Sequence, residues 1–245
     1  MPNSEPRSGV AARLARTLPD IPRWIETRSM LLSEECEVFV LEEGSSDFVV
    51  RDEELISVVG YPSWEAIRSA ASRGAVDLLA FSENRDHVSS ALPGWTDVRA
   101  ILHLLGDSSR LPAVPENSIR WLAESEIDAV GSESLELRSE LKLAFKESPI
   151  VASLEEGSPV SFCYASSQTE GLWDIAIDTL ESHWRRGHAS RCVAYMIEYM
   201  TPLRPVWAAE EINAASLGLA ARLGFVPVDE LTIFHPPTGA EAALR

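Results

Sequence analysis

The sequence predicts an α/β protein in which a mixed β-sheet is flanked by helices. Three observations predict this fold class. Some segments hold short apolar runs or alternating patterns that fit strands, others repeat apolar residues at helical spacing, and turn residues separate the two kinds of segment. At 245 residues and 45% hydrophobic content, the chain is long enough for one large domain or two small ones with ordered cores.

Turn residues are densest between Gly106 and Ser118, where Gly, Pro, Ser, Asp and Asn concentrate. We therefore place a linker at 111–118, between an N-terminal α/β domain at 21–110 and a second domain at 119–245. Residues 1–20 are expected to be partly disordered, because prolines and serines dominate the beginning of this stretch.

The N-terminal domain has alternating element signals. Strands are predicted at 37–41, 48–51, 75–81 and 98–105. The first two flank a turn at Gly44. A helix is predicted over 63–72, because Ser63 follows a proline and is a good N-cap.

The second domain has clearer signals. Strands are predicted at 119–122, 150–154, 159–165, 172–179 and 205–209, and helices at 133–147, from Ala189 to about Pro202, and after Asn213. The turn residues Glu155-Glu156-Gly157-Ser158 indicate a hairpin between the second and third of these strands.

A basic turn precedes the helix that begins near Ala189. It reads Trp184-Arg185-Arg186-Gly187-His188-Ala189-Ser190, and it follows the strand predicted at 172–179. A turn of this kind at a helix N-terminus presents unpaired backbone N–H groups and the positive end of the helix dipole. It is therefore a candidate site for a diphosphate, whereas the alternative is an exposed basic helix start.

A second motif follows after the next predicted strand. It begins at Asn213 and ends at Gly224-Phe225, with Ser216 three residues into the helix between them. Asn213 is a good N-cap and Gly224 a good C′ residue. Asn213 as a helix cap alone is the simpler interpretation of this position, and the two roles can coexist.

Together, the two motifs resemble the GNAT (Gcn5-related N-acetyltransferase) superfamily. The first resembles its acyl-CoA loop, Gln/Arg-x-x-Gly-x-Gly/Ala, with Trp184 in place of the first residue, and the second resembles Asn-x-x-Ala/Ser…Gly-Phe. The resemblance covers roughly 119–234. It implies a GNAT fold for this half, and we hypothesise that the N-terminal half is a degenerate GNAT-like copy without a cofactor.

The resemblance implies acetyl transfer from acetyl-CoA to a primary amine by direct attack. It implies a pantetheine-binding strand edge at Ile177-Asp178-Thr179, with the Thr179 N–H polarising the thioester carbonyl. The cofactor residues implied in total are Ile177, Asp178, Thr179, Arg185, Arg186, Gly187, His188, Ala189, Ser190, Asn213 and Ser216.

The attacking ammonium has to lose a proton to a general base. Glu170 is the leading candidate, because it enters the strand at 172–179. Asp174 is the second, since it alternates away from its apolar neighbours, and His183 near the loop is the third. For each of the three, the alternative is a solvated charge.

Many GNAT proteins carry a tyrosine that acts as general acid at the position of Ala220. Here, either another group, such as Ser216 or His183, or water protonates the departing CoA thiolate, or its departure needs no acid. This departure motivates the alternative function, a catalytically silent GNAT-fold acyl-CoA sensor or protein-interaction module.

The composition of the chain limits the classes of partner that we expect. The net charge is -17 and both halves are acidic, so we expect no nucleic-acid or anionic-membrane partner, whereas a cationic amine would be attracted. No apolar run reaches the roughly 20 residues of a membrane span, and the N-terminus lacks a secretory signal pattern. The three cysteines lack metal-ligand spacing, so we expect a cytoplasmic protein without a metal. A homodimer is left open.

Overall fold

The computed structural model describes residues 7–33, 35–40, 45–115, 117–130 and 135–237. The chain divides into two compact units. The first comprises the chain up to Leu102, Ala209–Asn213 and the chain from Val228, and the second comprises His103–Ala208 and Ala214–Pro227. None of the described helices has the length and apolar character required to cross a membrane.

The division falls inside strands. β5 (Thr96–Leu105), β10 (Arg204–Glu210) and β11 (Phe225–His235) each contribute residues to both units. The linker predicted at 111–118 therefore does not coincide with the structural division, because β5 is one continuous strand across the boundary at Leu102. The short 3-10 helix η2 (Ser108–Arg110) follows β5.

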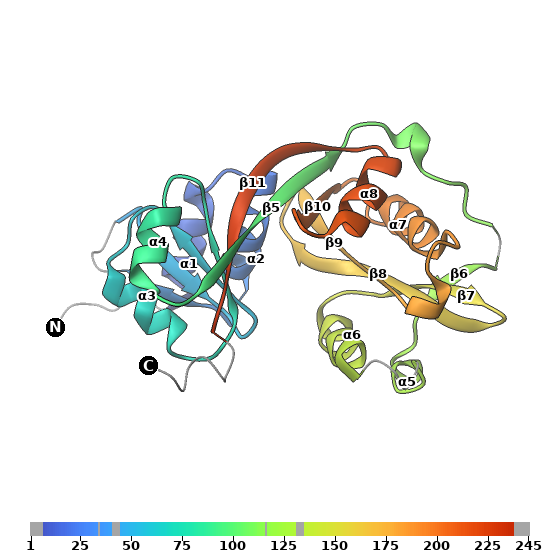
Figure 1. Cartoon of the computed structure of the whole chain (residues 1–245), viewed down its shortest axis with the longest axis horizontal. Helices are drawn as coiled ribbons and strands as arrows, with labels where there is room; N and C mark the ends of the chain where they lie inside the picture. Colours follow the sequence, from blue (N-terminus) through green and yellow to red (C-terminus); the bar gives the residue numbers. More distant parts are fainter. Residues whose placement is uncertain (1–6, 34, 41–44, 116, 131–134, 238–245) are drawn as a thin grey trace. The chain divides into compact units, whose positions relative to one another are not determined.

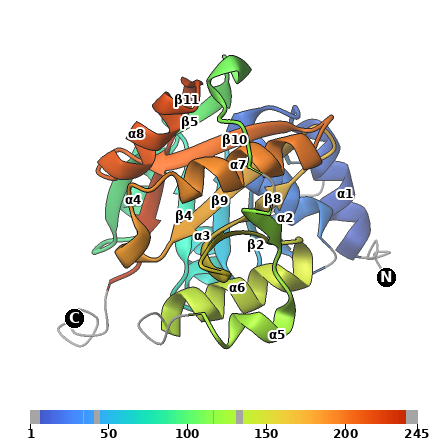
Figure 2. The same cartoon turned by 90° about the vertical axis from the view of Figure 1, so that its right-hand side faces the viewer.

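The second unit has a mixed sheet. β6 (Ile119–Trp121), β7 (Val151–Glu155), β8 (Ser158–Gln168) and β9 (Leu172–Thr179) are antiparallel neighbours in this order, and β10 pairs with β9 in parallel. α5 (Glu124–Ile127) and α6 (Leu135–Glu147) cover one face, and α7 (His188–Tyr199) and α8 (Ala214–Arg222) cover the other (Figures 1 and 2). η3 (Glu181–His183) lies in the segment that connects β9 to α7.

The first unit also has a mixed sheet. β1 (Glu37–Phe39), β2 (Phe48–Arg51) and β3 (Leu55–Val59) are antiparallel, and β4 (Asp77–Ala80) is parallel to β3. The last residues of β11 pair antiparallel with β4. The helical elements are α1 (Arg7–Thr17), η1 (Pro22–Trp24), α2 (Ile25–Leu32), α3 (Trp64–Ala71) and α4 (Arg85–Ala91).

The two halves repeat one order of elements. Two helices precede three antiparallel strands, a helix follows, then a strand parallel to the third, then another helix. In the first half these are α1 to α4 with β1 to β4, and in the second half they are α5 to α8 with β7 to β10. This repeated order is what a degenerate GNAT-like N-terminal half requires.

The stretch expected to be partly disordered contains helix α1. The buried residues of this stretch recur at helical spacing, at Ala11, Leu14 and Ala15 in α1 and at Leu18 just after it. They pack with residues of α2 and β2, among them Met30, Leu31, Phe48 and Val50. Burial of this apolar stripe, which a count of prolines and serines overlooks, orders residues 7–17.

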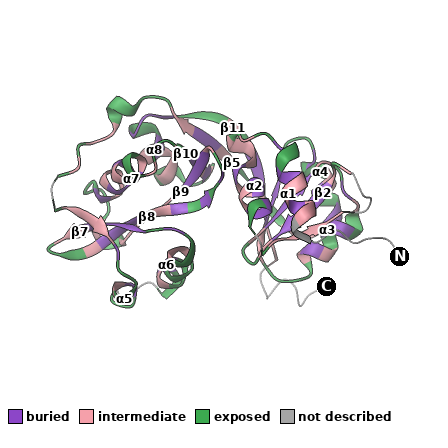
Figure 3. Cartoon of the chain, turned by 180° about the vertical axis from the view of Figure 1, so that it is seen from behind, coloured by how far each residue is buried: buried purple, intermediate pink, exposed green. Residues whose placement is uncertain are grey.

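The core of the second unit lies on the strands and on the sheet-facing sides of the helices (Figure 3). One apolar cluster fills the space between the sheet and α5 and α6, with Phe162 and Leu141 completely buried. Cys163 and Cys192 are also completely buried. Burial raises the pKa of Cys192 to about 12 and that of Cys163 well above its usual value, so both thiols stay protonated.

Candidate functional site

β9 and β10 pair over only a short distance. Their register runs from Leu172 opposite Arg204 to Asp174 opposite Val206. Beyond Asp174, the rest of β9 has no register partner in β10, although it stays paired with β8 as far as Thr179. Among the described residues of the second unit, the Ile175–Thr179 segment therefore has one unpaired backbone edge.

The direction of the backbone groups follows from the pairing of β8 with β9. The N–H of Leu180 donates to the carbonyl of Val160 at 2.9 Å. Because hydrogen-bonded and non-hydrogen-bonded pairs alternate in an antiparallel ladder, Asp178 also directs its backbone groups towards β8. The N–H and C=O groups of Ile177 and Thr179 then point towards the unpaired edge.

Trp184 ties the loop to this edge. Its indole Nε1 donates to the carbonyl oxygen of Thr179 at 2.7 Å, while 58% of the residue remains exposed. The Thr179 carbonyl is thereby occupied, and the Thr179 N–H is not involved in this bond. Trp184 thus stands in the first position of the loop motif with a role of its own.

The loop ends at a helix N-terminus in the left-handed region. Gly187 has φ 80 and is the N-cap of α7, and Arg185 also has a positive φ of 61. The Arg191 N–H makes a helical bond to the Gly187 carbonyl at 3.2 Å. The N–H groups of His188, Ala189 and Ser190 belong to the first turn, which has no carbonyl acceptors within its helix.

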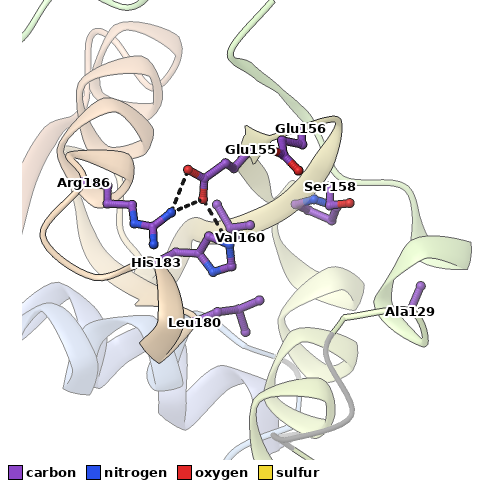
Figure 4. Close-up of a pocket in the computed structure, with 9 residues that line it drawn as sticks. Ala129, Glu155, Glu156, Ser158, Val160, Leu180, His183 and Arg186 are labelled. Carbon is purple, nitrogen blue, oxygen red and sulfur yellow. Dashed lines mark hydrogen bonds and ion pairs between the residues drawn. The ribbon is translucent and has the colours of Figure 1, made fainter.

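A carboxylate organises the side chains beside the loop (Figure 4). Arg186 donates from Nη1 to both oxygens of Glu155 at 2.9 Å, and His183 Nε2 lies 3.1 Å from Glu155 Oε2. The Arg186 guanidinium holds the pKa of Glu155 below its usual range. These three side chains border a cavity of about 580 Å³, whose wall is completed by Ala129, Glu156, Ser158, Pro159, Val160 and Leu180.

The three predicted base candidates lie at different points along β9. Glu170 is exposed in the turn before β9, at the opposite end of this strand from the loop. Asp174 is 5% exposed at the last paired position, and Ser166 Oγ donates to its Oδ2 at 3.1 Å. His183 lies in η3 and contacts Glu155. The structure therefore brings only His183 close to the loop.

Asp178, which the sequence predicts only as part of the strand edge, carries a largely buried carboxylate. It stands opposite Phe162, so both side chains project towards α5 and α6. Burial, together with the smaller effect of the neighbouring charge of Glu140 on α6, raises the pKa of Asp178 to about 6. Its alternation with Ile177 and Thr179 is visible in the sequence, but its environment is not.

Comparison with known proteins bears on this geometry. Residues 145–234, which contain β9, the loop, α7 and α8, match the sequence model of the GNAT acetyltransferase family. The C-terminal half of the chain is a GNAT domain. A search among curated proteins finds no significant match.

Solved structures share the fold of the whole chain at low identity. A GCN5-related N-acetyltransferase-like protein from Streptococcus suis has a TM-score of 0.69 at 17% identity, over 94% of this chain and 98% of that chain. A GCN5-related N-acetyltransferase from Kribbella flavida has a TM-score of 0.60 at 17% identity, over 96% and 99%. A tandem GNAT protein from the clavulanic acid biosynthesis pathway has 0.58 at 14%, over 95% of each chain. The predicted fold class is confirmed.

The second motif of the GNAT domain has mainly structural partners. Ser216 Oγ accepts a 2.9 Å hydrogen bond from the buried indole of Trp207, which ties α8 to β10. Ala220 is completely buried, and as an alanine it carries no hydroxyl. Asn213 directly precedes α8 and donates its N–H to the Glu210 carbonyl at 2.9 Å, within the first unit.

Gly224 of this motif is required by a close backbone approach. It has φ 91, as expected for a residue just after a helix, and its carbonyl accepts from the N–H groups of Gly106 and Asp107. A Cβ at this position would lie 2.2 Å from the Asp107 carbonyl oxygen. The glycine of the second motif therefore serves the packing of the GNAT domain.

In the first unit, a side chain fills the gap between β3 and β4, which corresponds to the gap between β9 and β10 in the second unit. The β3–β4 register ends at Ser57 opposite Leu79. Just beyond it, the completely buried Asn84 donates from Nδ2 to the carbonyls of Val58 and Gly60, both at 2.9 Å, and accepts from the Phe81 N–H at 2.8 Å. One side chain thus occupies the gap between the two parallel strands.

The helix start in the first unit is also satisfied internally. The N-cap of α3 is Ser63, as predicted, and its Oγ accepts a 3.2 Å hydrogen bond from the Ala66 N–H. The chain enters this helix through Pro62, without the basic glycine loop of the GNAT domain. Both features distinguish the first unit from the second.

Proposed function

We propose that this protein is an acetyl-CoA-dependent N-acetyltransferase that transfers an acetyl group to a primary amine by direct attack. The observation that carries this proposal is the unpaired edge of β9, which continues through η3 into the glycine loop at the N-terminus of α7. An extended amide-containing arm can add to such an edge like a strand, and a diphosphate can bind such a helix start.

The residues present fit acetyl-CoA at both ends. Towards the loop, Gly187 leaves room for the Arg191 guanidinium beside the helix N-terminus, since a Cβ there would lie 3.1 Å from Arg191 Nη1. Along the strand, Ile177 and Thr179 offer backbone groups about 7 Å apart, two residues along a strand. Acetyl-CoA supplies the acyl group as an activated thioester, and the chain has to hold it, polarise its carbonyl and accept a proton.

The order of the groups along β9 assigns their roles. An arm that begins at the loop meets Thr179 first and reaches Ile177 nearer to the point where β9 and β10 join. We therefore assign the contact with the arm to Thr179 and the role of oxyanion donor to the Ile177 N–H. The sequence predicts the Thr179 N–H for the second role, and Ile177 lies two residues before it in β9. A preorganised N–H that faces the developing charge lowers the barrier of acyl transfer.

Asp178 is the carboxylate best suited as general base. It lies between the two edge residues in sequence, and the described part of the chain shows no ion pair or hydrogen bond to its carboxylate. A pKa of about 6 leaves it ionised at neutral pH yet more basic than an ordinary aspartate. Glu170, Asp174 and His183 remain predicted alternatives for this role.

The test is thiol release from acetyl-CoA against a panel of primary amines that includes small metabolites, aminoglycosides and peptide N-termini, with calorimetric binding of CoA measured in parallel. We expect micromolar CoA binding and amine-dependent thiol release. Binding without turnover for any amine would favour the silent acyl-CoA sensor, for which the buried Ala220 is the supporting observation. Absence of CoA binding would contradict both functions.

A further inference from the structure

The three arginines at the loop differ in how their charge is used. Arg186 is held by both oxygens of Glu155, so its charge is largely neutralised before any anion arrives. Arg185 is exposed. Arg191 lies one turn into α7, outside the motif that the resemblance covers, and no carboxylate pairs with it among the described residues.

Arg191 folds back over the start of its own helix. Its Nη1 donates to the Arg186 carbonyl at 3.3 Å and lies 3.1 Å from where a Gly187 Cβ would stand. The guanidinium therefore lies against the glycine where the first-turn N–H groups emerge. Arg191 Nε is buried and, among the described residues, has no hydrogen-bond partner. The orientation of this side chain accordingly depends on its Nη atoms.

A buried histidine holds the other end of this guanidinium. Arg191 Nη2 lies 2.9 Å from His188 Nδ1, and His188 is only 5% exposed. An arginine can only donate, so Nδ1 has to be the unprotonated acceptor nitrogen. Ser153 Oγ on β7 lies 2.9 Å from the same nitrogen, so the serine hydroxyl and Arg191 share this acceptor.

From this geometry we infer that Arg191 is the cation that binds the diphosphate of acyl-CoA, and that the neutral ring of His188 is the positioning residue that holds it there. The inference rests on the proposed function and adds a residue that the loop motif does not contain. It also adds a cation to the anion site in a chain of net charge -17, where Arg186, one of the two arginines inside the motif, is already paired with Glu155.

Protonation of His188 should release Arg191, because an imidazolium cannot accept its hydrogen bond and repels its charge. Burial lowers the pKa of His188, and the adjacent Arg191 lowers it further, so the ring is neutral at pH 7. The charged or titratable groups that face His188 are Glu155 on β7, His183 in η3, Arg186 in the loop and Arg191 on α7. Of these, only Glu155 opposes the decrease in pKa.

The first experiment compares Arg191→Ala with Arg191→Lys on two ligands. We measure the Kd of CoA by calorimetry and kcat/KM for S-acetylpantetheine, which lacks the diphosphate. Arg191→Ala should raise the CoA Kd at least tenfold and leave kcat/KM for S-acetylpantetheine within twofold, whereas Arg191→Lys should recover part of the affinity. Arg222→Ala removes the same charge at the end of α8 and should leave the CoA Kd unchanged.

The second experiment addresses His188. His188→Asn keeps an acceptor atom near the place of Nδ1, and His188→Leu does not. His188→Leu should raise KM for acetyl-CoA about tenfold with kcat nearly unchanged, and His188→Asn should restore most of the difference. In the wild type the CoA Kd should rise as pH falls from 7 to 5, and this pH dependence should be absent in His188→Asn, which also serves if the leucine variant fails to fold.

The outcomes separate this inference from the proposed function. If the wild type binds CoA and Arg191→Ala binds it equally well, the role of Arg191 is refuted while the proposed function stands. The same conclusion follows if Arg191→Ala raises the CoA Kd and lowers kcat/KM for S-acetylpantetheine by the same factor, because the residue would then affect the whole fold and not the diphosphate. A wild-type protein that binds no CoA overturns both.

Discussion

The indole nitrogen of Trp184 donates a 2.7 Å hydrogen bond to the carbonyl oxygen of Thr179. This bond connects the first residue of the glycine loop with the last residue of β9, so it fixes how the loop leaves the strand. The position of the diphosphate site relative to the strand edge therefore depends on one side chain that is itself 58% exposed.

Replacement of this donor tests the connection. Trp184→Phe keeps an aromatic ring but removes the N–H, and a lost hydrogen bond of this kind costs about 1 kcal/mol. We expect KM for acetyl-CoA to rise about fivefold with kcat nearly unchanged, measured by steady-state thiol release. Trp64→Phe, at an exposed tryptophan of the first unit, is the matched control. An unchanged KM would show that the loop keeps its position without this bond.

The proposed oxyanion donor can be removed at the backbone. Ile177→Pro eliminates the N–H, and a proline is tolerated where a strand N–H points away from its neighbour. We expect kcat to fall about a hundredfold, whereas Ile177→Ala, which keeps the N–H, should lose less than tenfold. Single-turnover kinetics at saturating acetyl-CoA check this. A proline variant that is as active as the alanine variant would transfer the role back to Thr179.

The role of Asp178 predicts a pH dependence of activity. The carboxylate form is the base, so kcat/KM should rise with pH through about 6 and level off above. Asp178→Asn should lower kcat about a hundredfold or more and abolish this rise of kcat/KM with pH, with the CoA Kd nearly intact. Asp174→Asn and Glu170→Gln should keep the rise. If Glu170→Gln abolishes the rise instead, the general base lies at the end of β9 that is farther from the loop.

The same residue predicts an opposite effect on stability. Folding raises the pKa of Asp178 from 3.8 to about 6, so the protonated form is favoured in the folded state. Its contribution to stability is therefore present below pH 4 and is lost as pH rises through about 6. At pH 8, Asp178→Asn should raise the free energy of unfolding by up to about 3 kcal/mol, as measured by denaturant titration, with little change at pH 4.

Gly187 should tolerate no large side chain. Its φ of 80 is unfavourable for a β-branched residue, and a Cβ would crowd Arg191 Nη1. We expect Gly187→Val to weaken CoA binding more than tenfold, about 1.4 kcal/mol, in a calorimetric titration. Gly157→Val is the control, since this glycine has a φ of 84 but has open space around its Cβ position. A normal CoA Kd for Gly187→Val would show that the loop is not the diphosphate site.

Asn84 predicts the stoichiometry of binding. Because its side chain fills the gap between β3 and β4, the first unit should bind no CoA, and titration should give one CoA per chain. Asn84→Ala should lower the free energy of unfolding by about 1–3 kcal/mol, since it leaves buried backbone groups unpaired, and should not change the stoichiometry. Two equivalents of CoA bound to the wild type would contradict this account.

Local patterns in the sequence predicted much of the GNAT domain. The strand at Leu172–Thr179 and the helix after Gly187 agree with the structure within one residue at their beginnings, because an apolar run and a 3.6-residue period are local signals. The first unit was less accessible. β3, with the polar Ser57 inside an apolar run, and helix α1 were not predicted, since their burial depends on distant partners. The turn predicted at Gly44 and the start of the helix predicted at 133 lie outside the described residues.

The sequence points to the positions of the candidate site but not to the contacts of their side chains. The loop motif contains Gly187, and the resemblance to the GNAT superfamily implies the strand edge at Ile177-Asp178-Thr179. Arg186 meets Glu155, 31 positions away, only because β7, β8 and β9 pair side by side before the loop. Burial beside α6 changes Asp178 from an edge residue into a base candidate. Tertiary packing decides both, so neither has a signal in a single sequence.

Because β5 and β11 each contribute residues to both units, the protein cannot be divided by a single cut in the sequence. The first unit needs Thr232–Phe234 as a neighbour for β4, although these residues follow all residues of the second unit in the sequence. A fragment ending at the turn-rich segment before β6 would leave β4 with a bare edge, which invites aggregation. Expression of either half alone is therefore expected to yield insoluble material, so both halves have to be expressed together in one chain.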